Sequence, residues 1–291
     1  MAKYVGVDIG GTNLRVCQMD DDETLEYINT SDYSHDNAYD LLTHVANMIE
    51  RVPDFDKTSG IGISIAGSVD NISKKVVTSK NLSYLVNYPI VDTFYKIYNK
   101  PVCMENDAKL AAYGEALKGA GQKYDKVCYV TISTGLGGGL ILDKKIYQGA
   151  NNLGGYISRF YLDGEHTADD ILSGRVLLMK ARERIDNNID SNKDLFELYS
   201  MGNPEAINII NDFKHYLVIL LLNITAAYNP DIIILGGGLM KSKELFLKDV
   251  VTDYYHKVHP LAKHTIVTTK GLEEPGLVGA CLLNKSRRLT R

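Results

Sequence analysis

The sequence has no feature that is typical of a membrane-spanning, secreted or nucleic-acid-binding protein. Its longest apolar run, Leu217–Leu222, is far shorter than the ~20 residues that a bilayer needs. The net charge of −4 offers no basic surface for nucleic acid or anionic lipid. No signal peptide precedes the first strand-like segment, and the four cysteines form no C-x-x-C pair. We therefore expect a cytoplasmic protein with core thiols, and neither a membrane nor a nucleic acid as its partner.

Two widespread nucleotide-binding motifs are also missing. The glycine-rich stretch STGLGGG (133–139) has no lysine in the place that a P-loop requires. No helix with a later acidic residue opens directly from it, which argues against a dinucleotide site. The seven histidines show no metal-ligand spacing, and we interpret His166 as a surface residue.

What the chain does have is an alternation of short apolar strands and helical patterns, which is typical of an α/β fold. Its 291 residues are enough for two domains or two lobes. The pattern predicts strands that include 4–9, 14–19, 60–66, 127–133 and 232–235, helices that include 37–52, 107–118 and 204–228, and a long helical region from 168 onward.

One pattern occurs twice: VGVDIGGTNLRV (5–16) and VTISTGLGGGLIL (130–142) both consist of a strand, a polar residue, a glycine turn and a strand. Such a turn lets backbone N–H groups converge on a phosphate. One such turn in each half suggests two lobes that face each other across a nucleotide. Two ordinary hairpins are the alternative.

In the first turn, Asp8 ends a buried-looking strand, and Thr12 and Asn13 supply side-chain donors. A carboxylate beside phosphates would repel them unless a divalent cation lies between. Asp8 is therefore predicted to organise Mg²⁺ through water; the alternative is a hairpin with a solvated aspartate. ILGGGLM (234–240) could support a flat adenine on Gly236 and Gly237, or it could be a plain strand-to-helix turn.

MENDAKLAAYGEA (104–116) delivers Asn106 and Asp107 from a short strand to the start of a helix. The helix dipole and the free N–H groups hold a carboxylate ionised there. An ionised aspartate can accept the proton of a sugar hydroxyl as its oxygen attacks a γ-phosphoryl group. The alternative is an N-terminal aspartate with no chemistry.

Taken together, these motifs resemble the ROK family of bacterial sugar kinases and repressors. The resemblance rests on DIGGT (8–12), SIAGSVD (64–70), ENDAK (105–109), STGLGGGLILDKKIYQGANN (133–152) and the C-terminal LGGGLM and EPGLVGACLL. It implies an actin-like/hexokinase-like (ribonuclease H-like) two-lobed ATPase fold. We expect lobes at 1–118, with the helix at about 276–291 returning to it, and at 119–275. A homodimer is also what the resemblance implies.

The resemblance further implies MgATP-dependent phosphoryl transfer to a hexose, commonly at O6. It assigns the catalytic base to Asp107 and sugar contacts to Gly67, Asn106 and Asp107. It assigns phosphate binding to Asp8, Gly10, Gly11, Thr12, Thr134, Gly135, Gly137 and Gly138. The family's repressors carry an N-terminal helix-turn-helix domain, and this chain begins at its first strand. We therefore expect a kinase rather than a repressor.

The loop GANNLGGYISRF (149–160) departs from the family. It resembles G-x-N-G-x-A-G-E-I-G-H, whose Glu and His hold sugar hydroxyls, but Tyr156 and Arg159 occupy the Glu and His positions. The next segment, 161–174, contains no cysteine, so we expect no zinc site of the Cys₃His type. Asp169 lies where the family has a second sugar-binding Glu.

Three explanations of this loop compete. The enzyme could act on a different sugar such as a glycoside, with Tyr156, Arg159 and Asp169 as the contacts. The chain could instead be an inactive ATP- or sugar-binding regulatory protein, or the alignment could slip and the loop be structural. We favour the first, because Asp107 does nothing for ATP binding that would keep it in an inactive protein.

Overall fold

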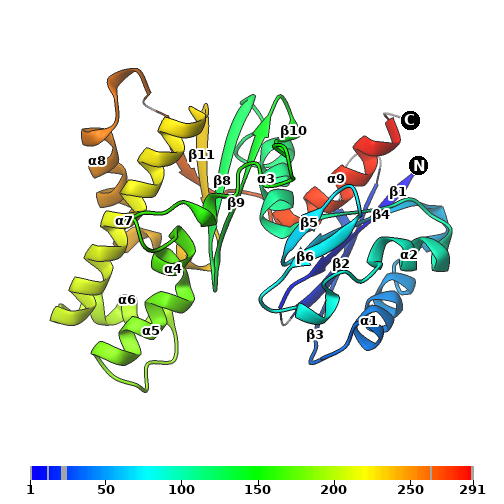
Figure 1. The fold of residues 1–291 in the computed structure, drawn as a ribbon, viewed down its shortest axis with the longest axis horizontal. Helices are drawn as coiled ribbons and strands as arrows, with labels where there is room; N and C mark the ends of the chain where they lie inside the picture. The colour runs from blue at the N-terminus through cyan, green and yellow to red at the C-terminus, as the bar shows by residue number, and fades with distance from the viewer. Residues whose placement is uncertain (1, 12, 21–24, 263, 290–291) are drawn as a thin grey trace. The chain divides into compact units, whose positions relative to one another are not determined.

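The computed structural model describes residues 2–11, 13–20, 25–262 and 264–289. The chain folds as two compact units (Figure 1). Unit 1 comprises Met1–Gln122, Lys144–Gly154 and Gly271–Arg291, and unit 2 comprises Lys123–Asp143 and Gly155–Lys270.

Unit 1 is built on a five-stranded sheet in the order β3-β2-β1-β4-β7. Strand β1 pairs antiparallel with β2 and parallel with β4, which in turn pairs parallel with β7. The strands are β1 (Lys3–Ile9), β2 (Asn13–Asp20), β3 (Leu25–Asp32), β4 (Thr58–Ile65) and β7 (Val102–Asn106), and a separate hairpin is formed by β5 (Ser68–Asp70) and β6 (Lys75–Thr78). The remaining elements are α1 (Ala38–Glu50), α2 (Ile90–Tyr98), α3 (Asp107–Lys118), α9 (Pro275–Leu289), β10 (Lys145–Ile146), η1 (Phe55–Lys57) and η2 (Ser83–Leu85).

The two faces of this sheet are covered by different helices because successive side chains of a strand point to opposite faces. Val5, Val7 and the isoleucines of β4 lie in one core with α1 and α2. The alternate positions face α9, where a Cβ on Gly62 would lie 1.9 Å from the carbonyl oxygen of Ala280. Figure 1 shows α1 and α9 on opposite sides of the sheet. Glycine is therefore required where α9 packs on β4.

Segment 144–154 belongs to unit 1, whereas the sequence-based division placed it in the second lobe. Lys144 explains part of this, because its Nζ donates to the carbonyl oxygens of Ala116 at 3.2 Å, Gly121 at 3.3 Å and Gln122 at 2.7 Å. The ammonium group thereby supplies a partner to one carbonyl in the last turn of α3 and to two carbonyls of the turn that follows it. Such long-range side-chain contacts leave no signal in the local pattern.

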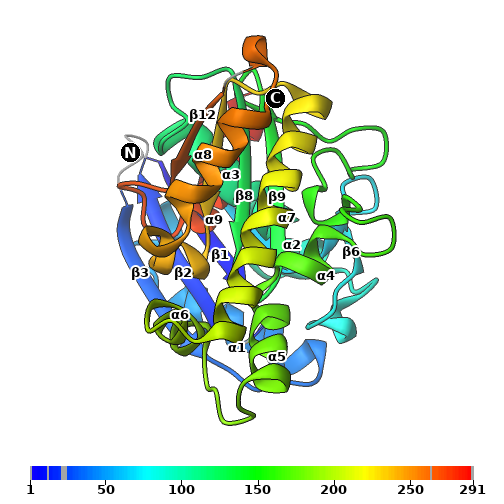
Figure 2. The same ribbon diagram turned by 90° about the vertical axis from the view of Figure 1, so that its left-hand side faces the viewer.

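Unit 2 is built on strands β9, β8, β11 and β12 in that order, with β9 antiparallel to β8 and the others parallel. These are β8 (Lys126–Ile132), β9 (Leu136–Leu142), β11 (Ile232–Gly236) and β12 (Thr265–Thr268). Its helices are η3 (Ile157–Arg159), α4 (Ala168–Leu172), α5 (Gly174–Arg184), α6 (Asn192–Ser200), α7 (Pro204–Tyr228), η4 (Gly238–Leu245), α8 (Leu247–Lys257) and η5 (Pro260–Ala262). Figure 2 shows α7 along one face of this sheet with α8 beside it.

Helix α7 begins at Pro204, after the N-cap Asn203, whose Oδ1 accepts from the N–H of Ala206 at 3.0 Å. By length and composition alone it could cross a membrane, but half of the relevant window is buried inside the protein. Its apolar side chains form the centre of the unit 2 core. We interpret α7 as a core helix for this reason.

The predicted alternation of strands and helices is confirmed, and the helices expected at 107–118 and 204–228 have those bounds. The long helical region expected from 168 onward is three helices instead. Ser173, between α4 and α5, has ψ 147°, which ends α4. The hairpin of β5 and β6 was not predicted, because its strands are too short to show a period.

Candidate functional site

In unit 1, the end of β1 places Asp8 between two neighbouring strands. Asp8 lies opposite Arg15 on β2 and Ser64 on β4. The hydroxyl of Ser64 donates to Asp8 Oδ1 at 2.6 Å, and Arg15 Nη1 lies 3.2 Å from Asp8 Oδ2. Arg15 Nη1 also lies 3.5 Å from Oε2 of Glu274. Both carboxylate oxygens of Asp8 therefore have protein partners.

Burial raises the pKa of Asp8 above its ordinary value, and the Ser64 hydrogen bond and the Arg15 charge oppose that shift. A positive charge placed beside this carboxylate would favour its ionised form further. The position thus suits a cation that keeps its own water molecules, as Mg²⁺ does.

The first glycine turn follows directly. The N–H of Gly10 donates to the carbonyl oxygen of Asn13 at 3.1 Å, and the hydroxyl of Tyr33 donates to the carbonyl oxygen of Gly10. Gly11 is exposed. Thr12, which we predicted as a phosphate contact, lies outside the described residues. Hydrogen bonds to Asn13 and Tyr33 thus hold Gly10 in place, and Gly11 lies exposed at the tip of the turn.

Three of the predicted sugar contacts of unit 1 lie together. Asn106 caps α3, with its Oδ1 accepting from the N–H of Lys109 at 3.1 Å. Its Nδ2 donates to the carbonyl oxygen of Gly67 at 3.0 Å and to Asp107 Oδ1 at 2.8 Å. The N–H of Ala108 also donates to Asp107 Oδ1, at 2.8 Å. Both of these bonds end on Oδ1 of the Asp107 carboxylate.

The pKa of Asp107 is raised to about 7, first by burial and second by the negative charge of Asp8, while the hydrogen bonds from Ala108 and Asn106 oppose the shift. The expectation that the helix start keeps this carboxylate ionised is therefore wrong, because desolvation and the charge of Asp8 outweigh the N–H groups, and Asp107 is ionised only in part at neutral pH. A group with that pKa is basic enough to take a proton in a transition state. Perturbed carboxylates of this kind are concentrated at functional sites. The role of Asp107 as general base stays a prediction.

In unit 2, the second glycine turn joins β8 to β9 and is held by two helices. The N–H groups of Gly174 and Arg175, at the start of α5, donate to the carbonyl oxygens of Ser133 at 2.8 Å and Thr134 at 3.0 Å. Asp169, on α4, accepts from the N–H of Leu136 at 2.8 Å through Oδ1. The second glycine turn is therefore held by hydrogen bonds from the start of α5 and from Asp169 on α4.

The glycines around this turn differ in what they do. Thr134 and Gly135 form the turn, whereas Gly137 and Gly138 lie in β9 opposite Thr131 and Val130. A Cβ on Gly138 would lie 2.6 Å from the carbonyl oxygen of Tyr129, so no larger residue fits there. Gly138 thus allows close packing within unit 2.

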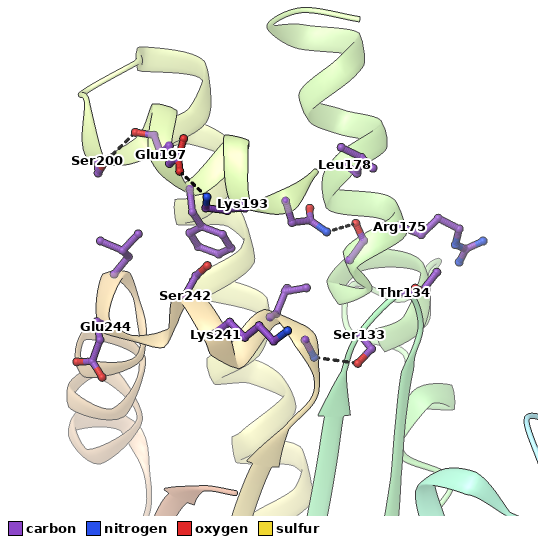
Figure 3. Close-up of a pocket in the computed structure, with 16 residues that line it drawn as sticks. Ser133, Thr134, Arg175, Leu178, Lys193, Glu197, Ser200, Lys241, Ser242 and Glu244 are labelled. Atoms are coloured by element: carbon purple, nitrogen blue, oxygen red, sulfur yellow. Dashed lines mark hydrogen bonds and ion pairs between the residues drawn. The ribbon is translucent and has the colours of Figure 1, made fainter. Parts of the chain in front are cut away.

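A pocket of about 760 Å³ opens beside the second glycine turn, wholly within unit 2 (Figure 3). One end carries Ser133, Thr134 and Arg175, and Figure 3 shows the side chain of Lys241 directed toward that end. The remaining lining residues are Gly174, Leu178, Asn192, Lys193, Phe196, Glu197, Ser200, Gly238, Leu239, Ser242, Glu244 and Leu245.

The predicted Gly236 and Gly237 lie next to Gly238, which lines this pocket and donates its N–H to Ser133 Oγ at 2.9 Å. Gly237 has φ +91°, and a Cβ there would meet the carbonyl oxygen of Ile132 at 2.4 Å. Its conformation is therefore one that only glycine adopts without strain. The glycine run turns the chain so that Gly238 reaches the pocket.

Sequence reasoning missed most of the pocket wall. Asn192 and Phe196 come from α6, Arg175 from α5, and Lys241 from η4, and none of them belongs to a recognisable motif. The only local signal is the serine N-cap Ser191 with Asp194 three residues on, which marks the start of α6 and not its role.

In the loop at 149–160, Tyr156 directly precedes η3 and Arg159 is its last residue, with Arg159 Cζ 6.0 Å from the centre of the Tyr156 ring. That distance is at the outer limit of a cation–π contact. Asp169 contacts the second glycine turn through Leu136 and lies 3.4 Å from Arg175 Nη2. These contacts connect Asp169 with the pocket.

No group of three or more His, Cys, Asp or Glu side chains that could hold a metal occurs in the described part of the chain. Segment 161–167 is closed instead by a bridge between Tyr161 and Thr167 and by Asp163, whose Oδ2 lies 2.8 Å from His166 Nδ1. The absence of zinc stays a prediction.

A family model described as the ROK family matches residues 4–287. The chain belongs to the ROK family. It is 25% identical over 311 residues to a glucokinase of Thermotoga maritima, with 98% of each chain covered. It is 26% identical over 270 residues to a xylose repressor of Bacillus subtilis, with 88% of this chain and 69% of the repressor covered.

The fold agrees with that of a solved ROK family glucokinase from Streptomyces griseus in complex with glucose and AMPPNP. The two share a TM-score of 0.82 and 24% identity, over 98% of this chain and all of that one. The predicted actin-like/hexokinase-like fold is confirmed by this likeness. The resemblance to ROK kinases supports a phosphotransferase that acts on an alcohol group, although the family also includes repressors.

Proposed function

We propose that this ROK protein is a cytoplasmic, MgATP-dependent kinase that phosphorylates a hydroxyl group, O6 by family resemblance, of a hexose or a hexose derivative such as a glycoside. The observation that carries the proposal is Asp107, held by Asn106 and with its pKa raised to about 7. A regulatory protein that only binds ATP has no evident need for such a base.

Unit 2 supplies the nucleotide site in this proposal. The end of the pocket with Thr134, Arg175 and Lys241 carries positive charge and backbone N–H groups, which suit phosphates. The adenine would lie toward Phe196 and Leu245, because an aromatic and an aliphatic wall suit a flat base. Orientation of the nucleotide follows from the uneven charge of the pocket.

Asp8 would hold Mg²⁺ through water in unit 1, with Ser64 and Arg15 fixing the carboxylate. A Mg²⁺ ion supplies charge neutralisation of the phosphate oxygens when bound. Because one carboxylate plus phosphates is a normal magnesium environment, the single acid at this position fits the ion.

In the proposed reaction Asp107 Oδ2 accepts the hydroxyl proton while the sugar oxygen forms a bond to the γ-phosphorus. The bond from the γ-phosphorus to the β–γ bridging oxygen breaks, and ADP leaves. Asn106 holds Asp107, and because both N–H groups of its amide are used by Gly67 and Asp107, its Oδ1 and the carbonyl oxygen of Gly67 are the atoms that would accept hydrogen bonds from the sugar. The amide and the carbonyl orient the hydroxyl, and the base removes its proton.

The choice of sugar is assigned in this proposal to the loop at 149–160, which departs from the family pattern. We propose that Tyr156 packs on an apolar face of the sugar or on an aglycone, and that Arg159 meets an acidic or carbonyl substituent. Loss of the family's glutamate near C1 suits a substituted anomeric oxygen. A homodimer is the assembly we expect, to be checked by light scattering.

The alternative is an inactive ROK-type regulatory protein that binds ATP or sugar. It is favoured by one observation, the replacement of the family's Glu and His by Tyr156 and Arg159. The two proposals differ in whether sugar-dependent turnover exists.

The experiment is ADP release from MgATP with glucose, mannose, fructose, N-acetylhexosamines, cellobiose and salicin. Asp107→Asn should lower kcat by about 10²- to 10⁴-fold while ATP binding persists, because a general base contributes about that much. Asp92→Asn, an exposed aspartate in the first turn of α2, is the matched control. Near-normal turnover of Asp107→Asn would overturn the assignment. ATP binding without turnover on any sugar would favour the regulatory alternative.

A further inference from the structure

Two ionisable side chains of unit 1, Glu105 and Lys109, are buried on either side of Asn106 and Asp107. Glu105 is fully buried and Lys109 is 4% exposed. Ionisable groups are almost never buried unless every charge is matched by partners. The motif ENDAK therefore contains two residues that its proposed chemistry does not use, and their partners show what they are for.

The carboxylate of Glu105 accepts four hydrogen bonds. Oε1 accepts from the N–H of Asn106 at 2.9 Å and from Asn152 Nδ2 at 3.4 Å. Oε2 accepts from Gln148 Nε2 at 2.8 Å and from Asn71 Nδ2 at 2.9 Å. Because each oxygen of this carboxylate accepts two hydrogen bonds, the carboxylate is held in one orientation.

The ammonium group of Lys109 completes the set. Its Nζ donates to the carbonyl oxygen of Asn152 at 2.6 Å, to Gln148 Oε1 at 3.0 Å and to Asn152 Oδ1 at 3.5 Å. Burial lowers the pKa of Lys109, and the charge of Glu105 opposes that shift. Gln148 thus links the two charges, since it donates to Glu105 and accepts from Lys109.

The cluster joins three segments that are far apart in the sequence. Glu105 and Lys109 come from the end of β7 and from α3, and Asn71 follows β5. Gln148 and Asn152 come from segment 144–154, which contains the start of the loop at 149–160, called the sugar loop below. Asn71 Nδ2 also donates to Asn152 Oδ1 at 2.9 Å, and Asn152 Nδ2 donates to the carbonyl oxygen of Val69. All of these residues belong to unit 1.

Asp107 is reached from this cluster in two steps. Glu105 fixes the backbone N–H of Asn106, and the backbone N–H of Lys109 fixes Asn106 Oδ1. Asn106 Nδ2 then donates to Asp107 Oδ1. A small displacement of a base can cost about 100-fold in rate. The cluster is therefore placed to decide the orientation of Oδ2.

We infer that Glu105 and Lys109 are positioning residues, which orient the base Asp107 through Asn106 and hold the sugar loop through Gln148 and Asn152. The inference rests on the proposed kinase function. It predicts that damage to the cluster impairs use of the sugar and leaves the nucleotide site of unit 2 unaffected.

The test uses Glu105→Gln in the full chain, with the panel sugar that the wild type turns over fastest. The new amide presents an NH₂ group to two of the four donors, which misaligns Asn106. We expect kcat/KM for the sugar to fall by about 10- to 100-fold. KM for ATP should change by less than about twofold. Glu115→Gln is the matched control, because Glu115 is a fully buried carboxylate at the far end of α3.

A second variant keeps the test decisive if Glu105→Gln folds poorly. The double variant Glu105→Gln/Gln148→Glu exchanges the two groups, so that the new carboxylate at 148 can accept from both Lys109 and the new amide. We expect it to recover most of the lost stability and at least about tenfold of the lost kcat/KM. Recovery of this kind requires a hydrogen bond between the side chains at positions 105 and 148. If Glu105→Gln acted only through a general loss of packing, the second substitution would not restore activity.

The outcomes separate the inference from the proposed function. No sugar-dependent turnover in the wild type would overturn both. Wild-type turnover with equal kcat/KM losses in Glu105→Gln and Glu115→Gln, or with a rise in KM for ATP, would overturn the inference alone. A selective loss on the sugar side, restored by the exchange, supports it.

Discussion

Arg15 lies directly opposite Asp8 in the pairing of β1 with β2, and its Nη1 is 3.2 Å from Asp8 Oδ2. This arginine offsets a buried negative charge at the place where we propose that Mg²⁺ is held. It also lies 3.5 Å from Glu274, which precedes α9. The ion pair connects the first glycine turn with the C-terminal part of unit 1.

Removing the arginine should therefore destabilise the protein in a pH-dependent manner. We expect Arg15→Met to lower the free energy of unfolding by about 1–3 kcal/mol at pH 7, because it leaves the partly buried carboxylate of Asp8 without its positively charged partner. The loss should shrink at pH 5, since the raised pKa of Asp8 lets it take up a proton. Urea unfolding at both pH values measures this. Equal losses at pH 5 and pH 7 would contradict it. Arg51→Met, at an exposed arginine that follows α1, is the control.

The activity should rise with pH through about 7, because Asp107 must be ionised to accept a proton and its pKa is about 7. A profile of kcat/KM between pH 5 and pH 9 measures the acidic limb. The limb should move to lower pH in Asp8→Asn, because the charge of Asp8 is the second cause of the shift. A limb below pH 5 in the wild type would show that another group limits the reaction.

The raised pKa of Asp107 should also affect the stability of the fold, which should fall with rising pH whereas the activity rises. The ordinary pKa of Asp is 3.8, so between that value and about 7 the folded chain binds more protons than the unfolded chain. Stability contributed by Asp107 is therefore lost as pH rises through this window. We expect Asp107→Asn to be more stable than the wild type at pH 8, by an amount on the order of 2 kcal/mol. Thermal melts at pH 4.5 and pH 8 test the sign: no gain at pH 8 would contradict it.

Asp169 should act on the nucleotide side. Because it holds the N–H of Leu136 and lies beside Arg175, Asp169→Ala should loosen the second glycine turn and raise KM for ATP by about tenfold. Asp170→Ala is the control, since Asp170 is the next residue and serves the capping box of α4. A rise in KM for the sugar alone would instead support the role that family resemblance gives to Asp169.

Arg159 should set the choice of sugar. We expect Arg159→Ala to change the ratio of kcat/KM between the preferred and the poorest accepted sugar by about 10-fold or more, without altering KM for ATP. Arg184→Ala, an exposed arginine in the last turn of α5, should change neither value. Equal loss on every sugar would show that Arg159 supports the loop and does not select.

The purified protein should contain no stoichiometric zinc. Segment 161–174 has no cysteine, and Asp163 and His166 bond to each other at 2.8 Å. Elemental analysis and a thermal melt with and without a strong chelator measure this. About one zinc per chain, or a melt that the chelator lowers, would contradict it.

Local patterns in the sequence were enough to predict the α/β order, the glycine turns and the bounds of α3 and α7. These features depend on neighbours within a few residues: the period of apolar side chains, the caps Asn106 and Asn203, and glycine where the turns form. The motifs also led to Asp8, at the end of a strand before a glycine turn, and to Asn106 and Asp107, between a strand and a helix.

Only the tertiary structure decided what those residues touch. The pocket wall gathers Arg175, Phe196 and Lys241 from three helices. Segment 144–154 belongs to unit 1, where Lys109 donates to Asn152 and Lys144 donates to Gln122. The raised pKa of Asp107 likewise comes from burial and from Asp8 across the sheet. Such effects depend on distance in space, because desolvation and charge act between segments that the chain order keeps far apart.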